Sequence, residues 1–372
     1  MKKNFWQKLK KPIMCLAPMA DVTDAAFRSI IAKYGKPDIF FTEFTSADGL
    51  CNLKGRKSLI INLKFTSKER PIVAQLFGAN PEKMRVAAAL VLKLGFDGLD
   101  INMGCPDRSI EKSGAGAALM KNPKLAREII RSAIEGVRGR IPVSVKTRLG
   151  YNKDELEIWL PEILKENVSA VTIHARTRKE MSLVPARWDR VKVAVKIRDD
   201  LKSKALILGN GDIRNKEDAK EKIKETGADG VMLGRAIFGN PWLFNKSLKK
   251  EITKEQKLKT MVEHARLFGK TFGSRNPDTK SQTDSRFAQK GKSLFGTRTR
   301  PGSGAGLIPA NRDLPLLKGK SRTVIKNFAI MKKHFKAYAN GFDGAKELRI
   351  RLMETNDSKE VAKIVNDFLR ES

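Results

Sequence analysis

The chain has 372 residues, 41% of them hydrophobic, so it is long enough for one large domain and a smaller one. Its 74 lysines and arginines outnumber 41 acidic residues, and the net charge of +33 predicts binding to a polyanion such as nucleic acid. No uncharged apolar run is long enough for a transmembrane helix. Cys15, Cys51 and Cys105 are too scattered for a disulfide framework or a CxxC zinc site. We therefore expect a cytoplasmic, monomeric protein with no metal and no membrane association.

Short apolar or β-branched runs recur along the chain, separated by segments with apolar residues at helical spacing. Eight such strands alternating with helices over about 235 residues predict a (β/α)8 TIM barrel. A doubly wound open sheet is the alternative, but the Gly-x-Gly-x-x-Gly turn expected after its first strand is missing. The predicted strands are 13–19, 38–44, 71–77, 98–104, 142–148, 170–176, 205–211 and 230–236.

After residue 245 the pattern changes to lysine-rich amphipathic stretches, which predict a small α-helical domain. We therefore expect a catalytic barrel over 1–245 and a helical domain over 246–372. The stretch 273–322 lacks periodicity and is rich in Gly, Ser, Pro and Arg, which predicts a disordered insertion. It is either a basic loop that contacts RNA or an insertion without function.

The last two predicted strands end in the glycine turns GNGDI and GRAIFGNPW. A barrel commonly binds phosphate at this place, through backbone N–H groups and a short helix. Ordinary barrel turns are the alternative, but two such turns on adjacent strands favour phosphate. The predicted phosphate site consists of Asn210, Gly211, Asp212, Gly234 and Arg235.

Three other polar residues near strand ends suit a flavin. Lys146 ends an apolar strand, where an inward lysine is costly unless an anion meets it, as at the N1/O2 edge of a reduced flavin. Gln75 offers a donor and an acceptor for the flavin's pyrimidine edge. His174 would often be a core residue, but Arg176 and Arg178 after it favour a ligand contact.

Cys105 lies in NMGCP, just past the fourth predicted strand and therefore on the catalytic face. Its unperturbed pKa of roughly 8.5 keeps the thiol protonated at neutral pH, so it suits a general acid. No neighbouring base indicates a nucleophile. Cys15 and Cys51 are expected to be small buried hydrophobic residues. His264 and His334 fall in basic helices, and we expect them on the surface or facing RNA.

Motifs of one family follow each other in order through the barrel. They closely resemble the tRNA-dihydrouridine synthase family, and its bacterial branch more than its eukaryotic one. The resemblance departs at Asp21, where the family usually has glycine; this residue either alters the flavin approach or lies outside it. The segment 273–322 has no counterpart in the family. The motifs are APMADVTDAAFR (17–28), TEFTSADGL (42–50), VAQLFG (73–78), DINMGCP (100–106), VKTRLG (145–150), HARTR (174–178), GNGDI (209–213) and GRAIFGNPWLF (234–244).

The resemblance implies an FMN-dependent oxidoreductase that reduces selected uridines in tRNA, with NADPH, or NADH, as the electron donor. The basic helical region would then hold the tRNA backbone while the target base is extruded from the RNA. By motif, the implied site residues are Pro18, Met19, Ala20, Gln75, Lys146 and His174 for the flavin ring, Asn210, Gly211, Asp212, Gly234 and Arg235 for its phosphate end, Asn102 and Arg176 for the uracil, and Cys105 as the proton donor to C5.

Two other functions stay open. One is an FMN barrel acting on a free pyrimidine, similar to dihydroorotate or dihydropyrimidine dehydrogenases; the net charge and the basic tail argue against it. The other is a catalytically silent RNA-binding protein on a barrel scaffold. The presence of Cys105, Lys146 and the phosphate motifs argues against that second alternative.

Overall fold

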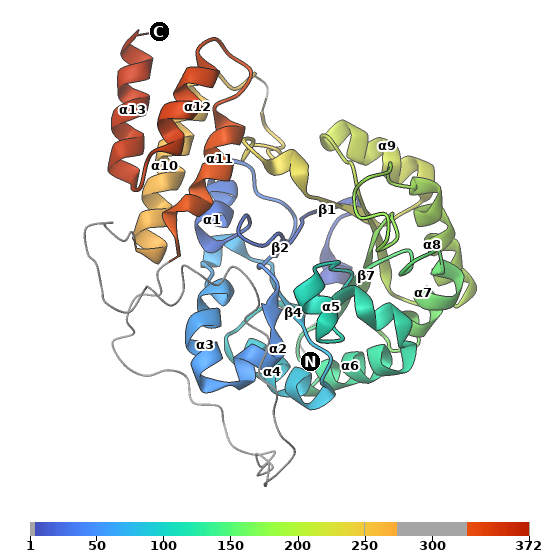
Figure 1. Ribbon diagram of the computed structural model, residues 1–372. Helices are drawn as coiled ribbons and strands as arrows, with labels where there is room; N and C mark the ends of the chain where they lie inside the picture. The colour runs from blue at the N-terminus through green and yellow to red at the C-terminus, as the bar shows by residue number, and fades with distance from the viewer. Residues whose placement is uncertain (1–3, 249, 274–325, 372) are drawn as a thin grey trace.

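The computed structural model describes residues 4–248, 250–273 and 326–371, and its strands and helices alternate around a barrel (Figure 1). The strands are β1 (Ile13–Leu16), β2 (Phe40–Phe41), β3 (Thr45–Ser46), β4 (Ile72–Phe77), β5 (Gly98–Met103), β6 (Val143–Arg148), β7 (Ala170–His174), β8 (Leu206–Asn210) and β9 (Gly230–Leu233). The helices of the barrel are α1 (Ala25–Tyr34), α2 (Ala47–Cys51), α3 (Leu53–Leu59), α4 (Pro81–Lys93), α5 (Arg108–Lys112), α6 (Pro123–Gly136), α7 (Leu156–Leu164), α8 (Trp188–Asp200) and α9 (Lys216–Thr226).

All strand pairs are parallel, in the order β1-β9-β8-β7-β6-β5-β4-β2, and β3 is a short addition beside β4. A parallel bridge between Cys15 and Ile39 joins the two ends of this order and closes the barrel. The predicted (β/α)8 barrel is therefore confirmed. Several strands end two or three residues earlier than predicted, because the polar residues after them belong to the connecting loops.

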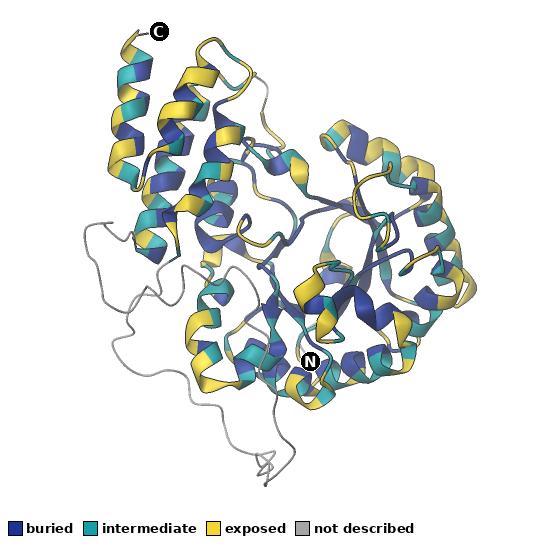
Figure 2. Cartoon of the chain, in the orientation of Figure 1, coloured by how far each residue is buried: buried dark blue, intermediate teal, exposed yellow. Residues whose placement is uncertain are grey.

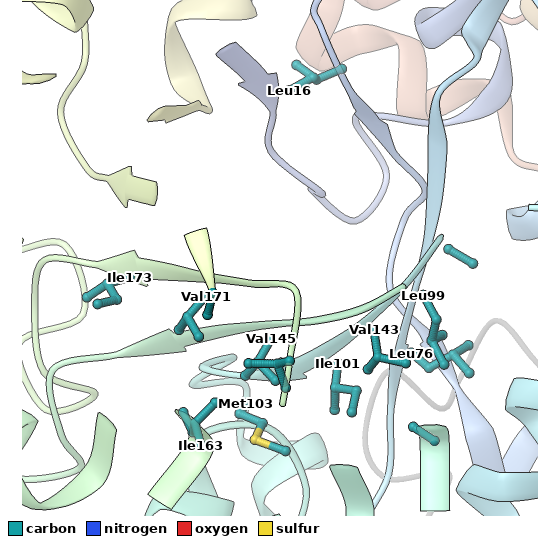
Figure 3. Close-up of a cluster of buried hydrophobic side chains, with 14 of the residues drawn as sticks. Leu16, Leu76, Leu99, Ile101, Met103, Val143, Val145, Ile163, Val171 and Ile173 are labelled. Atoms are coloured by element: carbon teal, nitrogen blue, oxygen red, sulfur yellow. The ribbon is translucent and has the colours of Figure 1, made fainter. Parts of the chain in front are cut away.

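Alternation along the strands divides the apolar residues into two layers. One set faces the surrounding helices; Figure 3 shows members of it from β4 to β7 with Ile163 of α7 nearby. The other set fills the barrel interior near the start of the strands, where Trp6 of the short helix η1 (Phe5–Lys8) joins it. Both layers are buried, so the strands appear dark in Figure 2 while the outer helix faces are exposed.

The C-terminal residues form a separate group of helices beside α1 (Figure 1). They have their own apolar core, to which α1 contributes Ala25 and Ala26. A boundary between domains at residue 245 stays a prediction; the first helix of this group begins at Lys254. The group, called the helical region below, consists of α10 (Lys254–Phe272), the short η6 (Phe328–Ile330), α11 (Met331–Tyr338), α12 (Ala345–Met353) and α13 (Ser358–Glu371).

His264 and His334 are not on the surface, so that expectation was wrong. Both are fully buried, with their ring centroids 4.6 Å apart, and both pack on Phe27 of α1. The helical spacing explains this: His264 lies three residues after Met261, a core residue, and therefore on the same face of α10. The histidines join the helical region to the barrel.

Other expectations for this part of the chain have mixed outcomes. The segment 273–322 lies outside the described residues except for Gly273, so its predicted disorder stays a prediction. Cys15 is fully buried as expected, but Cys51 is only half-buried, and its thiol donates a hydrogen bond to the Lys83 carbonyl at 3.3 Å. No helix among the described residues is long and apolar enough to span a membrane.

Candidate active site

A cavity of about 280 Å³ opens at the carboxyl ends of the barrel strands. Most of the residues predicted for a flavin or its phosphate line it, so the structure brings them together. Ala20, Gln75, Asn102 and Cys105, which were also expected at the site, are not among the lining residues. The cavity is lined by Ala17, Pro18, Met19, Lys146, His174, Arg176, Ser182, Asn210, Gly211, Asp212, Ile213, Met232, Gly234 and Arg235.

Below the cavity, inward-facing polar side chains form a continuous chain of hydrogen bonds. Asp100 accepts hydrogen bonds from Ser144 Oγ at 2.6 Å and from Gln75 Nε2 at 2.7 Å. Gln75 Oε1 in turn accepts from Asn102 Nδ2 at 3.1 Å. Burial raises the pKa of Asp100 to about 6, since the hydrogen bonds and Lys146 offset only part of the desolvation. The network holds Gln75 in place and takes up part of its hydrogen-bonding capacity.

Asn102 positions Cys105 through the turn between them. The Asn102 carbonyl oxygen Oδ1 accepts from the backbone N–H of Gly104 at 3.1 Å and of Cys105 at 2.9 Å. The Cys105 carbonyl accepts from the Ala117 N–H at 3.0 Å, which holds the other side of the turn. Whether Asn102 also contacts a base stays a prediction, because its exposed fraction is only 6%.

Cys105 is half-buried, and burial is the main cause that raises its thiol pKa. The Asp107 backbone N–H, Lys146 and Arg148 act in the opposite direction without cancelling it. The thiol therefore stays protonated at neutral pH. This is the protonation state that a general acid needs.

The Lys146 amine lacks an ion-pair contact among the described residues, although the buried Asp100 is near enough to raise its pKa. Lys146 lies opposite Asn102 in the register of β5 and β6, and it lines the cavity. No described residue makes a hydrogen bond or an ion pair with its amine. Burial, and after it the nearby Arg148 charge, lowers its pKa to about 8, while Asp100 and Cys105 act in the opposite direction. A half-buried amine in this state favours an anionic ligand in the cavity.

Arg176 links the histidine of β7 to the phosphate turn. Its guanidinium donates to His174 Nε2 at 3.1 Å, to Asp212 and to the Val184 carbonyl. Because an arginine only donates, His174 Nε2 must accept, which places the imidazole proton on Nδ1. Burial, followed by the charge of Lys146, holds the pKa of His174 far below its usual value. Direct contact between Arg176 and a base stays a prediction, since Arg176 is 2% exposed.

The two predicted phosphate turns follow the adjacent strands β8 and β9, and both line the cavity. Gly211 has φ of 131°, and a Cβ there would lie 2.7 Å from the Ala186 side chain, so only glycine fits. Asp212 pairs with Arg176 and with the exposed Arg235, whose Nη2 lies 2.6 Å from Asp212 Oδ1. With Lys146, two arginines and one aspartate, the cavity keeps an excess of positive charge, as a phosphate requires.

Sequence reasoning missed two buried charged residues at this site, Asp100 and Arg148. Arg148 donates to the carbonyls of Gly104, Thr177 and Met181, so it joins the loops after β5 and β7. Asp100 was detectable, because it is an acidic residue in an apolar strand two positions before Asn102. The role of Arg148 was not detectable in the sequence, because its partners are backbone carbonyls, which every residue has. Among the described residues, no group of three or more histidine, cysteine or acidic side chains suits a metal ion.

Comparisons with known proteins identify relatives over the full length of the chain. A family model described as dihydrouridine synthase matches residues 15–284. The chain is 36% identical to the "Probable tRNA-dihydrouridine synthase 2" of Bacillus subtilis (strain 168) over 371 residues, covering 100% of this chain and 98% of the relative. It is 35% identical to the "Probable tRNA-dihydrouridine synthase" of Staphylococcus aureus (strain COL), covering 99% of this chain and 96% of the relative. Among solved structures, a histamine dehydrogenase from Rhizobium sp. 4-9 aligns with a TM-score of 0.43 and 15% identity over 69% of this chain and 48% of that one.

Proposed function

Because the chain belongs to the dihydrouridine synthase family, we propose that it reduces the C5–C6 double bond of specific uridines in tRNA. The observation that supports this reaction best is the protonated Cys105 thiol, held by Asn102 on the same face of the barrel as a cavity with an unpaired lysine. Reduction of a C5–C6 double bond needs one hydride and one proton. A protonated thiol at the rim of a redox cofactor site supplies the second of these.

The cavity fits FMN as the cofactor. The unpaired Lys146 amine suits the negative charge that develops at one edge of a reduced flavin, and the turns of Gly211 and Gly234 with Arg235 suit its phosphate. Met19 and Pro18 offer apolar surface for the ring system. When bound, FMN supplies hydride that it obtains from NADPH. The contact of Gln75 with the ring stays a prediction, because two neighbours already use its amide.

The other parts of the reaction, which are charge stabilisation, positioning and proton transfer, are assigned to side chains of this protein. The Lys146 amine stabilises negative charge on the ligand in the cavity. Arg176 fixes the tautomer of His174 and the position of Asp212. Cys105 transfers its thiol proton to C5 of the uracil, which leaves a thiolate that solvent reprotonates. Burial favours that last step, since it raises the pKa of the thiol and makes the thiolate a good proton acceptor.

We propose that tRNA binds across the barrel mouth and the helical region, with residues 1–245 as the catalytic domain and 246–372 as the tRNA-binding domain. The net charge of +33 supports a polyanionic substrate in the cytoplasm. The target base lies inside folded RNA, so it must be extruded to reach the cavity. A free pyrimidine needs neither this charge nor the helical region.

The test is reduction of an unmodified tRNA transcript by the purified full-length protein with FMN and NADPH. We expect NADPH oxidation that depends on the tRNA and yields dihydrouridine in it. Oxidation with free uracil or orotate in place of tRNA would support a free-pyrimidine enzyme instead. Tight tRNA binding by a colourless protein without turnover would support a silent RNA-binding barrel.

A further inference from the structure

Glu43 is a buried carboxylate that contacts both the barrel and the helical region. It follows β2 and is 3% exposed. Its Oε1 accepts a hydrogen bond from the Asp21 N–H at 2.7 Å, and its Oε2 lies 2.7 Å from Lys326 Nζ. Lys326 stands just before η6, and the Phe272 ring at the end of α10 lies 5.2 Å from its amine. One carboxylate thus joins segments that are far apart in the chain.

The turn that Glu43 holds also forms part of the cofactor cavity. Pro18 and Met19 line the cavity, and Asp21 follows them at φ of 54°, a left-handed conformation that is uncommon for residues other than glycine. The exposed Asp21 side chain lies outside the cavity lining, so the departure from glycine affects the backbone rather than the pocket surface. Thr23 Oγ1 accepts from the Met19 N–H at 2.9 Å. The Glu43 hydrogen bond therefore fixes the outer side of this turn.

A second buried acid, Asp24, lies beside Glu43. Asp24 Oδ1 caps α1 by accepting from the Phe27 N–H at 2.9 Å, whereas Oδ2 is buried without a hydrogen-bond partner among the described residues. Burial, and after it the charge of Glu43, raises the pKa of Asp24 to about 6, while Lys326 acts in the opposite direction. The nearby Arg28 pairs with Glu69 instead. Lys326 thus contacts Glu43 directly, and its charge stabilises the ionised form of Asp24 more than that of Arg28 does.

We propose that Lys326 is a positioning residue that couples the docking of the helical region to the conformation of the cofactor turn 18–23. Without this amine, Glu43 and Asp24 repel each other in a buried place, and Glu43 turns toward water and releases the Asp21 N–H. Such coupling is reciprocal, so a ligand that fixes the turn also strengthens the docking of the helical region. The identification of that ligand as FMN rests on the proposed function. The effect of Lys326 on the turn 18–23 does not depend on it.

The first experiment measures FMN affinity by flavin fluorescence in titrations of the full-length, flavin-free protein. We expect Lys326→Met to raise the Kd for FMN about tenfold, which is within the range of measured coupling energies. Lys326→Arg should keep the affinity, because it keeps the buried cation. Lys336→Met, on the exposed face of α11, is the matched control for the loss of one lysine and should leave Kd unchanged. The double variant Glu43→Gln with Lys326→Met should recover affinity, since glutamine still accepts from the Asp21 N–H and the charge repulsion between residue 43 and Asp24 is removed.

The second experiment measures hydrogen exchange without FMN. In Lys326→Met, the backbone amides of 19–24 should exchange faster than in the wild-type protein and in Lys336→Met. In the wild-type protein, adding FMN should slow exchange in η6 and α11. This last comparison decides the coupling even if Lys326→Met does not fold.

The outcomes separate this inference from the proposed function. Unchanged FMN affinity together with unchanged exchange in Lys326→Met would overturn the coupling, as would FMN binding that leaves η6 and α11 unaffected. A wild-type protein that does not bind FMN would contradict the proposed cofactor. The exchange of 19–24 would then still decide whether Lys326 holds the turn.

Discussion

The two ends of the barrel interior are built by the same strands but have opposite chemistry. Val73 and Gln75 are two positions apart on β4, and Leu208 and Asn210 are two positions apart on β8. Because side chains of a strand alternate, both members of each pair face the interior. The first member belongs to the apolar cluster near the strand starts, and the second is a buried polar residue nearer the cavity. The strand starts therefore close the barrel, and the strand ends form the site.

The polar end is itself of two kinds. Gln75, Asp100, Asn102 and Ser144 hydrogen-bond to one another, so burying them is compensated. Lys146 has no such partner among the described residues, and Cys105 is held by its backbone while its thiol stays protonated. The hydrogen-bonded layer gives rigidity, whereas Lys146 and Cys105 have no side-chain partner among the described residues and are the groups that a ligand would contact. The predictions below test this distinction.

The largest expected effect is that of Cys105→Ala. If Cys105 is the proton donor, single-turnover dihydrouridine formation should slow by about 10²–10⁴-fold, the range usual for general acid catalysis. FMN content should not change, because Cys105 does not line the cavity. Rapid-quench analysis of the tRNA product measures the rate. Cys51→Ala, at a half-buried thiol on α2, is the matched control and should keep full activity; full activity in Cys105→Ala would refute the assignment.

A smaller effect is expected for Asn102→Ala, which keeps the thiol but removes the acceptor for two backbone N–H groups. Misplacing a catalytic group by about 1 Å slows turnover by about 10²-fold, so a loss of roughly 10- to 100-fold is expected. Asn102→Asp keeps the acceptor oxygen and should recover part of the rate. If both variants were equally inactive, the acceptor oxygen alone would not be sufficient, and the amide N–H that Asn102 donates to Gln75 or to the substrate would be required as well.

His264 and His334 are buried polar side chains that lie outside the cavity lining, so they can be compared with the polar groups at the strand ends. Burial lowers the pKa of His334 to about 3 and holds that of His264 well below its usual value, and the ring nitrogens of both have no partner among the described residues. Folded-state pKa values below the unfolded value mean that the unfolded chain binds more protons. The contribution of the pair is therefore fully present above roughly pH 6.5 and decreases by about 1.4 kcal/mol per histidine for each pH unit below it.

The measurement is the pH dependence of thermal or urea unfolding between about pH 7.5 and 5.5. This range extends roughly one pH unit on either side of the pKa of a histidine in the unfolded chain. The wild-type protein is compared with the double variant His264→Phe and His334→Phe. Only the difference between them reports on the histidines, because Asp24 and Asp100, with raised pKa values, change stability in the opposite direction over this range. Equal pH dependence in the two proteins would contradict a buried neutral pair.

The barrel was predictable because each strand is a short apolar run that ends in polar or glycine residues. The same endings indicated Lys146, His174 and the turns of β8 and β9, which the structure brings to one cavity. Arg148 and Lys326 were not predictable in this way. Their roles depend on partners distant in the chain, such as Glu43, which lies 283 positions from Lys326. The burial of His264 was detectable from its spacing to core residues of α10, but the lysine-rich surroundings favoured the opposite conclusion.

The smallest predicted effect is a change in the stability of the flavin-free protein when Lys146 is replaced. At this residue, stability and cofactor binding are expected to change in opposite directions. Replacing an unpaired, half-buried amine by methionine removes a desolvation penalty, so the flavin-free protein should gain about 1 kcal/mol in free energy of unfolding. The same change removes the cation expected at the flavin edge, so FMN should no longer raise the unfolding temperature. Lys204→Met, at an exposed lysine before β8, is the control and should change neither quantity. If Lys146→Met instead destabilised the flavin-free protein, the amine would have a favourable interaction in the folded state, and Lys146 would belong with the hydrogen-bonded layer below it.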